Sequence, residues 1–375
     1  MTLGMEWVET AAGARSVAPD ECSVPLQGLI LRAGSSRSRA LFVFLRPASA
    51  WQLMPIERAT ADAGSDVLCA TSRFARNEAL ATFEESLLDI GAWIRTARQN
   101  WGYERVLLLG WSGSGTLSAF YQAQAERPTI KAIPGGRELD LARAGLPTAD
   151  GLIFQGAHAS RARMLADAID PSVLDEAEAR RRDPTLDLYG SEAPTPPYPA
   201  AFLSRYRAAQ RARIERISIQ ARQQLLHDDA AVRQRPVVVE RTMADPHYLD
   251  PTIDPNERVS GLCWLGAPAA VNIAPGGIAR ISTPEAWLSQ WSLADSNADA
   301  VRSARSIRCP LLAIENGADD AVPPAHLRET FEAAASPDKS YARIAGASHS
   351  YAGQPRQLAE AVAVARRWAE ERELA

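Results

Sequence analysis

Short, almost continuous apolar runs alternate with longer segments of helical periodicity over the first 160 residues, and this alternation constrains the fold most. Strands of a parallel sheet read as such runs, because the connecting helices cover both faces of the sheet. The chain has 375 residues, of which 46% are hydrophobic, so it is long enough to bury a large core. The sequence therefore predicts an α/β fold, with a mostly parallel sheet and helices on both faces.

The expected elements fall into two blocks, separated by a different kind of sequence. Strands are predicted at 25–32, 40–45, 65–70, 105–109, 151–155, 310–315 and 341–345, and helices at 77–100, 115–126, 200–225, 324–335 and 355–373. Between about 160 and 305 the chain is charged, arginine-rich and interrupted by prolines, and 183–199 is typical of a loop or surface arm. We therefore expect a core made of 1–159 and 306–375, with a mainly helical cap inserted at 160–305.

Charge and composition exclude several classes of function. The formal net charge of −4 does not favour binding to nucleic acid or to an anionic membrane. No run is apolar over the roughly 18 residues that a membrane span needs, and the N-terminus lacks the apolar centre of a signal peptide. Four scattered cysteines without C-x-x-C spacing predict neither a disulfide framework nor a zinc site.

These exclusions predict a cytoplasmic protein that acts on a small molecule. We expect no metal and no other cofactor, and no nucleic-acid or membrane partner. The proline-rich and arginine-rich segments of the insertion would also suit a contact between two copies, so a homodimer is one expectation for the assembly.

The stretch V-L-L-L-G-W-S-G-S-G-T (106–116) places glycines and two serines between a predicted strand and a predicted helix. A phosphate-binding P-loop is excluded, because no lysine follows the glycines. A dinucleotide-binding turn would need an acidic residue after the following strand, and such turns tend to follow the first strand of their unit. The remaining interpretation is a nucleophile elbow, a sharp strand–turn–helix that exposes one side chain above the sheet.

Steric rules choose between the two serines of this elbow. The positions two residues before and after the nucleophile approach each other, so both must be small. For Ser112 these positions are Gly110 and Ser114, whereas for Ser114 they would be Ser112 and the β-branched Thr116. The apolar run also ends at Leu109, just before this turn. Ser112 is therefore the predicted nucleophile, and Ser114 is the small residue that lets the turn close.

A serine hydroxyl reacts only when a histidine base and an orienting carboxylate accompany it. Of the five histidines, His349 follows the last predicted strand, where a loop can carry it over the carboxyl edge of the sheet. The acid should lie between serine and histidine in the chain, and G-A-D-D-A-V-P-P (317–324) supplies two aspartates after a strand. His158 follows the strand at 151–155 and would also face such a site.

G-W-S-G-S near residue 112, G-A-D-D-A-V-P-P at 317–324 and G-A-S-H at 346–349 resemble the α/β-hydrolase superfamily in residues, order and spacing. The resemblance covers roughly 25–160 and 306–375, and it implies a cap after the sixth strand. The V-P that follows the aspartates is similar to the superfamily's usual D-x-x-V-P, which selects Asp319 rather than Asp320 as the acid.

The resemblance also implies an oxyanion hole built from two backbone N–H groups. One belongs to Gly113, which follows the nucleophile. The other belongs to the loop after the third strand, where the superfamily often has His-Gly and this chain has Arg46-Pro47. Proline has no N–H to donate, so Ala48 becomes the second donor by position.

These residues together predict a serine hydrolase that cleaves a carboxylic ester or lactone of an apolar or aromatic small molecule through an acyl-enzyme. Trp51 and Trp111 flank the oxyanion and nucleophile loops and, with His158, are predicted substrate contacts. The same triad would serve a C–C bond hydrolase of a diketone-like compound, or an acyltransferase. A non-catalytic binding protein is the alternative from another class, and the intact serine, aspartate and histidine argue against it.

Overall fold

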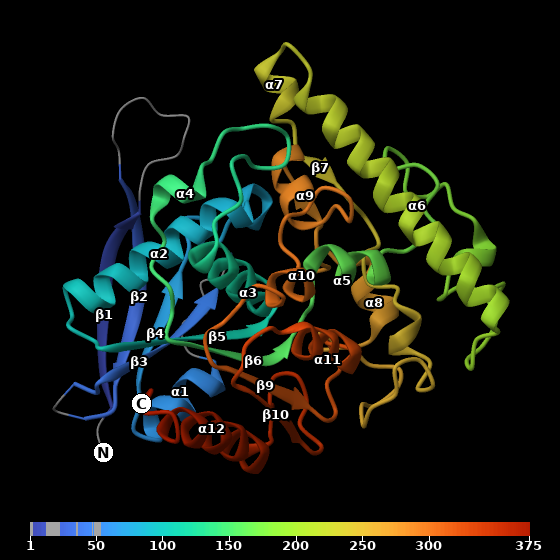
Figure 1. Cartoon of the computed structure of the whole chain (residues 1–375). Helices are drawn as coiled ribbons and strands as arrows, with labels where there is room; N and C mark the ends of the chain where they lie inside the picture. Colours follow the sequence, from blue (N-terminus) through green and yellow to red (C-terminus); the bar gives the residue numbers. More distant parts are fainter. Residues whose placement is uncertain (1–2, 13–22, 35–36, 47, 49–53) are drawn as a thin grey trace.

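The computed structural model describes residues 3–12, 23–34, 37–46, 48 and 54–375, and its centre is an eight-stranded sheet (Figure 1). The strands lie in the order β1-β2-β4-β3-β5-β6-β9-β10. β2 runs antiparallel to both of its neighbours, and all other pairs in this sheet are parallel. The strands are β1 (Gly4–Ala12), β2 (Val24–Arg32), β3 (Ala40–Arg46), β4 (Asp66–Thr71), β5 (Arg105–Ser112), β6 (Gly151–Ala157), β9 (Leu311–Asn316) and β10 (Lys339–Ile344).

Helices cover both faces of the sheet and fill the segment between β6 and β9, here called the insertion. Helices outside the insertion are α1 (Pro55–Asp62), η1 (Glu78–Leu80), α2 (Phe83–Gln99), α3 (Gly113–Glu126), α4 (Leu141–Ala144), α11 (Pro324–Ala333) and α12 (Pro355–Glu370). The insertion holds α5 (Arg161–Ala168), η2 (Pro184–Leu186), α6 (Ala200–Leu225), α7 (Ala230–Arg233), β7 (Val237–Val238), η3 (Pro246–Tyr248), α8 (Pro268–Ile273), β8 (Ile281–Ser282), α9 (Pro284–Gln290) and α10 (Ala300–Ala304).

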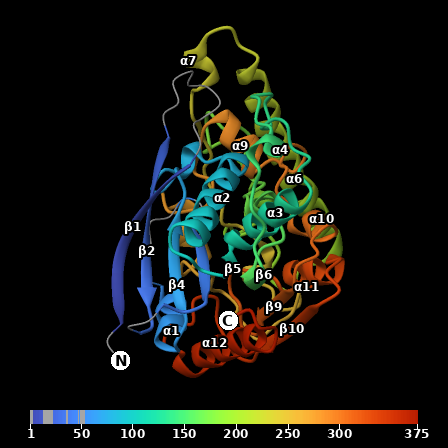
Figure 2. The same cartoon turned by 60° about the vertical axis from the view of Figure 1, so that its left-hand side comes forward.

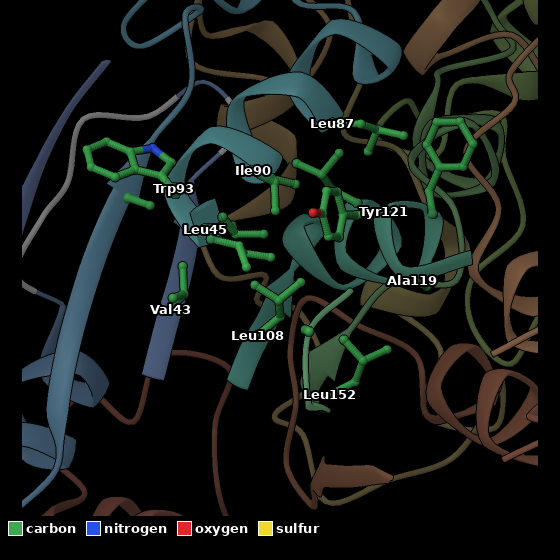
Figure 3. Packing of buried hydrophobic residues seen from close by; sticks show 14 of the residues in the cluster. Val43, Leu45, Leu87, Ile90, Trp93, Leu108, Ala119, Tyr121 and Leu152 are labelled. Carbon is green, nitrogen blue, oxygen red and sulfur yellow. The ribbon is translucent and has the colours of Figure 1, made fainter. Parts of the chain in front are cut away.

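The alternation of side chains along each strand divides the core into two layers. In β3, Leu41, Val43 and Leu45 belong to the cluster formed with α2 and α3, part of which Figure 3 shows. Phe42 and Phe44 point the other way and pack with α1 and α12. Figure 2 shows these two pairs of helices on opposite sides of the sheet. Because both faces are covered, β3, β4, β6 and β9 are buried along their whole length.

The insertion has small apolar clusters of its own. The long helix α6, at the right of Figure 1, packs against α5 and α9 around Ile214, Ile217, Trp287 and Trp291. At the end of the insertion, α10 returns to the core, because its alanines share the cluster of α2 and α3. These two indoles therefore fill the interior of the insertion.

The predicted α/β class and helical insertion are confirmed, and the seven expected strands all form. The structure adds β1 and α1, which the sequence pattern did not predict. The predicted helix at 77–100 begins instead with the short η1, and α2 starts at Phe83. In the described ranges, none of the helices combines the length and apolar character that crossing a membrane requires.

Candidate active site

Ser112 stands at the junction between β5 and α3, in a conformation that few residues adopt. Its φ is 57° and its ψ is −129°, and it is one of the few non-glycine residues with positive φ. Such strain persists where surrounding structure imposes it, and a sharp strand-to-helix turn is one such place. Although Ser112 occupies the N-cap of α3, its side chain makes no capping hydrogen bond. The half-buried hydroxyl is therefore not used by the helix.

Two glycines make the turn around Ser112 sterically feasible. A Cβ atom on Gly110 would lie 2.7 Å from the Cα of Gly115, and one on Gly115 would lie 2.3 Å from the Cβ of Ala157. The closest approach to Gly110 is thus three residues after the nucleophile, not at Ser114 as the sequence rule predicts. Ser114 is buried instead, and its hydroxyl donates a 2.6 Å hydrogen bond to the carbonyl of Leu45. That bond leaves Ser114 a structural role.

His349 and Asp319 form a buried pair beyond the carboxyl ends of the strands. His349 Nδ1 lies 3.1 Å from the Asp319 carboxylate, and both side chains are about 3% exposed. Asp319 Oδ1 also accepts the backbone N–H groups of Ala321 and Val322, at 2.9 and 2.8 Å. These bonds fix the carboxylate, which in turn can hold the imidazole with Nδ1 protonated and Nε2 free to accept a proton.

Gly156, next to the end of β6, provides the space in which this pair meets. Its φ is +47°, and a Cβ atom there would lie 2.9 Å from Asp319 Oδ2 and 3.6 Å from His349 Nδ1. The neighbouring Ala157 is paired with Ser112 in the sheet. Ser112, Asp319 and His349 lie far apart in the sequence. They come together because the ends of β5, β6 and β9 adjoin in the sheet.

The two aspartates of the 317–324 turn have different partners. Asp319 faces the ring of His349, whereas Asp320 Oδ1 accepts the backbone N–H of His349 at 3.3 Å. Burial and the adjacent negative charge of Asp319 raise the pKa of Asp320. The structure thus brings Asp319, not Asp320, to the imidazole, which is the arrangement that the D-x-x-V-P resemblance implies.

Trp111 holds His349 from a second direction. The two rings stack with centroids 4.4 Å apart and planes 29° apart, and the indole N–H donates to the carbonyl of His349 at 3.1 Å. The Arg46 guanidinium lies 4.8 Å from the same indole centroid and pairs with the buried Glu57. Trp111 was predicted as a substrate contact, and its observed contacts are with the histidine; a contact with substrate stays a prediction.

The loop that carries His349 is fixed by a further polar network. Tyr351 takes a positive φ of 56°, and its hydroxyl accepts a 2.6 Å hydrogen bond from Gln155 and donates to Asn316. Asn316 Nδ2 donates in turn to the carbonyls of Ser348 and His349. No hydrogen bond links the Ser112 hydroxyl to His349 within the described part of the chain. Such bonds often tighten only when substrate binds.

The predicted oxyanion donors are placed unequally. Gly113 is the first residue of α3, where backbone N–H groups have no partner within the helix. Ala48 is half-buried, and its carbonyl accepts the N–H of Arg76 at 2.7 Å. Its role as second donor stays a prediction, since Pro47 and 49–53 lie outside the described residues. The predicted substrate contact Trp51 lies outside them as well.

His158 is buried directly beside the nucleophile turn. Its backbone N–H donates to the carbonyl of Ser112 at 3.1 Å, and its ring meets His326 edge-on at 5.5 Å. Burial, and then the unfavourable electrostatic interaction of a protonated ring with His326, His349 and Arg161, hold the pKa of His158 well below its usual range. Burial lowers the pKa of His326 to about 3. Both imidazoles are therefore neutral at pH 7, and their part in substrate binding stays a prediction.

Sequence reasoning missed Gly156, Asn316, Tyr351 and Arg161. The last of these starts α5, and its side chain lies beside Gly113. A glycine or an arginine beside a strand end carries no signal of its own in an arginine-rich sequence. Only the three-dimensional proximity to His349 or Gly113 distinguishes these positions.

Among comparisons with known proteins, only the comparison of structures finds similar ones. Neither a protein-family model nor a curated protein matches the sequence. The structure of DcsB in complex with its substrate analogue is similar at a TM-score of 0.56, with 12% identity and coverage of 98% of this chain and 99% of that one. The esterase domain of a Rhodothermus marinus protein aligns at a TM-score of 0.49, with 14% identity and coverage of 99% of both chains. An α/β-fold family hydrolase from Bacillus anthracis aligns at 0.45, with 10% identity and coverage of 98% and 99%.

The sheet order, the single antiparallel strand within it and the insertion after β6 define the fold of this chain. It is the α/β-hydrolase fold, as the motifs of the sequence predicted. At such low sequence identity the likeness establishes the fold, and the chemistry must be argued from the residues of this chain.

Proposed function

We propose that this protein hydrolyses a carboxylic ester through a covalent acyl-enzyme on Ser112. The observation that carries the proposal is the strained turn at Ser112, set beside a buried imidazole–carboxylate pair. A hydroxyl that no helix cap uses, and an imidazole fixed by a carboxylate, are the two components that activate a serine nucleophile. The esterases among proteins of similar structure agree with this chemistry at the level of reaction class.

In the proposed reaction, His349 Nε2 takes the proton of Ser112 as Oγ attacks the ester carbonyl carbon. Asp319 holds the imidazole in the required tautomer and stabilises the imidazolium that forms. The N–H of Gly113, with that of Ala48 as second donor, binds the oxyanion of the tetrahedral intermediate. The intermediate collapses with departure of the alcohol, which receives the proton from His349. Water then repeats the sequence and releases the acid.

Labelling by a fluorophosphonate tests the nucleophile directly. We expect one adduct, mapped to Ser112 by mass spectrometry, and loss of labelling in Ser112→Ala. That variant should also lose at least about 10⁴-fold in kcat on p-nitrophenyl butyrate. Ser114→Ala is the matched control and should keep its labelling. An adduct on Ser114, or an unlabelled protein, would contradict the proposal.

The two aspartates provide a second, independent test. Asp319→Asn should lower kcat by about 10⁴-fold, because the imidazole would then lose the acceptor that fixes its tautomer. Asp320→Asn keeps a side-chain acceptor for the backbone N–H of His349, so we expect a much smaller effect. Equal losses of kcat in the two variants would contradict the assignment of Asp319 as the acid of the triad.

A further inference from the structure

Arg161, the first residue of α5, reaches back to the nucleophile turn. Its Cγ, Cδ and Nε atoms lie 3.7 to 3.9 Å from the place that a Cβ atom on Gly113 would occupy. Gly113 directly follows Ser112 and supplies the firmer of the two proposed oxyanion donors. An arginine whose side chain lies this close to the Cα of Gly113 adjoins the place where the reacting ester would bind.

The guanidinium of Arg161 is desolvated and oriented. The residue is 9% exposed, and Nη1 donates to the side chain of Gln290 at 2.8 Å. The guanidinium also lies 4.1 Å from the ring centroid of Trp291 and pairs through Nη2 with Glu78. A planar cation held in this way needs little further ordering to bind a carboxylate.

The charge of Arg161 is compensated less completely than that of a comparable arginine. Arg137 also bridges core and insertion, and it bonds both Glu85 and Glu285, whose side chains are 3% and 24% exposed. In the described part of the chain, the carboxylate paired with Arg161 is that of Glu78, whose side chain is 43% exposed. Because the Glu78 side chain is 43% exposed, water can solvate its carboxylate again when a second carboxylate takes its place on Arg161, so the exchange costs little.

We propose that Arg161 binds a free carboxylate of the substrate, and that Glu78 occupies this place until the substrate arrives. The substrate would then be an ester that carries a second, unesterified carboxyl group, such as a dicarboxylic monoester or an acylated hydroxy acid. The inference rests on the proposed ester hydrolysis at Ser112. It also adds an anionic group to the apolar or aromatic substrate that the sequence predicts.

Paired esters of equal reactivity class test this specificity. One pair is p-nitrophenyl hydrogen adipate and p-nitrophenyl heptanoate, with the carboxylate on the acyl side. The other is 4-acetoxybenzoate and its methyl ester, with the carboxylate on the alcohol side. We expect the wild-type protein to prefer the anionic member of at least one pair in kcat/KM. A preference for the neutral member of both pairs would overturn the inference.

Two variants should change this preference in opposite directions. Arg161→Met keeps much of the side-chain volume, removes the cation, and should lower kcat/KM for the preferred anionic ester by about 10- to 100-fold, mainly through KM, while its neutral partner changes little. Glu78→Gln removes the competing carboxylate and should lower KM for the same anionic ester. A residue that only joins insertion to core would instead give losses of the same sign, on charged and neutral esters alike.

Arg137→Met is the matched control, because it breaks an ion pair between core and insertion elsewhere. It should leave the ratio of anionic to neutral hydrolysis unchanged. Glu78→Gln keeps the inference testable if Arg161→Met fails to fold, because an unchanged or higher KM for the anionic ester in that variant overturns it. Fluorophosphonate labelling of Ser112 is measured in parallel. An unlabelled wild-type protein refutes the proposed function. Normal labelling, together with an unchanged ratio of anionic to neutral hydrolysis in Arg161→Met and Glu78→Gln, refutes only the role of Arg161.

Discussion

The ends of the parallel strands and the insertion hold their shapes by different physical means. At the strand ends, close packing leaves no room for a side chain on two glycines: a Cβ atom on Gly110 would meet the backbone of Gly115, and one on Gly115 would meet the Cβ of Ala157. In the insertion, charged side chains bind backbone carbonyls. Arg213 is 1% exposed, and it donates to the carbonyls of Asp170, Glu240 and Arg241 as well as to Glu176.

This difference separates the residues proposed to carry out the reaction from the region proposed to recognise the substrate. The turn of Ser112 and the pair of His349 and Asp319 depend on close packing, which tolerates almost no change of volume. The insertion combines small apolar clusters with charged side chains that bind backbone carbonyls, as Arg213 does. Arg161 stands where the two regions meet, since it begins the first helix of the insertion and its side chain packs beside the empty Cβ position of Gly113.

Replacing Arg213 by methionine should destabilise the insertion strongly while leaving the strand ends unchanged. Arg213→Met removes the donor of the carbonyls of Asp170 and Glu240 and the buried cation paired with Glu176, which keeps only the half-exposed Arg216. This should cost about 3–5 kcal/mol of unfolding free energy. Urea unfolding measures this loss. If the two regions are as distinct as we infer, fluorophosphonate labelling of Ser112 in the folded variant stays close to wild type. Loss of labelling in the folded variant would show that they are coupled.

Filling the nucleophile turn should have a smaller effect on stability and a larger one on chemistry. Gly115→Ala places a Cβ atom against Ala157 and should cost about 3 kcal/mol, the upper end of the usual range for overpacking. The shift needed to relieve the contact moves Ser112, so labelling slows. Gly276→Ala, in the insertion, meets nothing within 4 Å and is the control. Equal behaviour of the two variants would refute the packing argument.

The buried histidines make the boundary between the two regions sensitive to acid. Burial first, and then the charges of Arg163 and His247, lower the pKa of His326 from 6.5 to about 3. Below pH 6.5 the unfolded chain therefore binds a proton at His326 that the folded chain does not bind. The free energy of unfolding decreases as the pH falls below 6.5. Between pH 6.5 and 5 this one group accounts for about 2 kcal/mol.

His326→Gln should remove that share of the pH dependence. The measurement is urea unfolding at pH 7 and pH 5, with the exposed His227→Gln as the control that leaves the dependence unchanged. An unaltered slope in His326→Gln would mean that the folded protein can accommodate the charged imidazole at this position.

The sequence predicted the central strands well because β3, β4, β6 and β9 are buried runs bounded by turns. It missed β1, whose residues Met5 and Trp7 stay 60% and 68% exposed and give no buried pattern. The positions of Ser112, Asp319 and His349 followed from their order along the chain and from the ends of strands. The contacts of Trp111, Gly156 and Arg161 could not be predicted in this way. They join residues that lie far apart in the sequence and that only the folded structure brings together.

The stacking of Trp111 on His349 gives the candidate site an optical property. Indole emission responds to charge and movement in a ring placed against it, and these two centroids are 4.4 Å apart. The imidazole would gain and lose a proton in each proposed turnover. The chain has nine tryptophans, so the difference between wild type and Trp111→Phe isolates this one. Acylation could then be followed as a fluorescence change of the protein itself, with substrates that carry no chromophore.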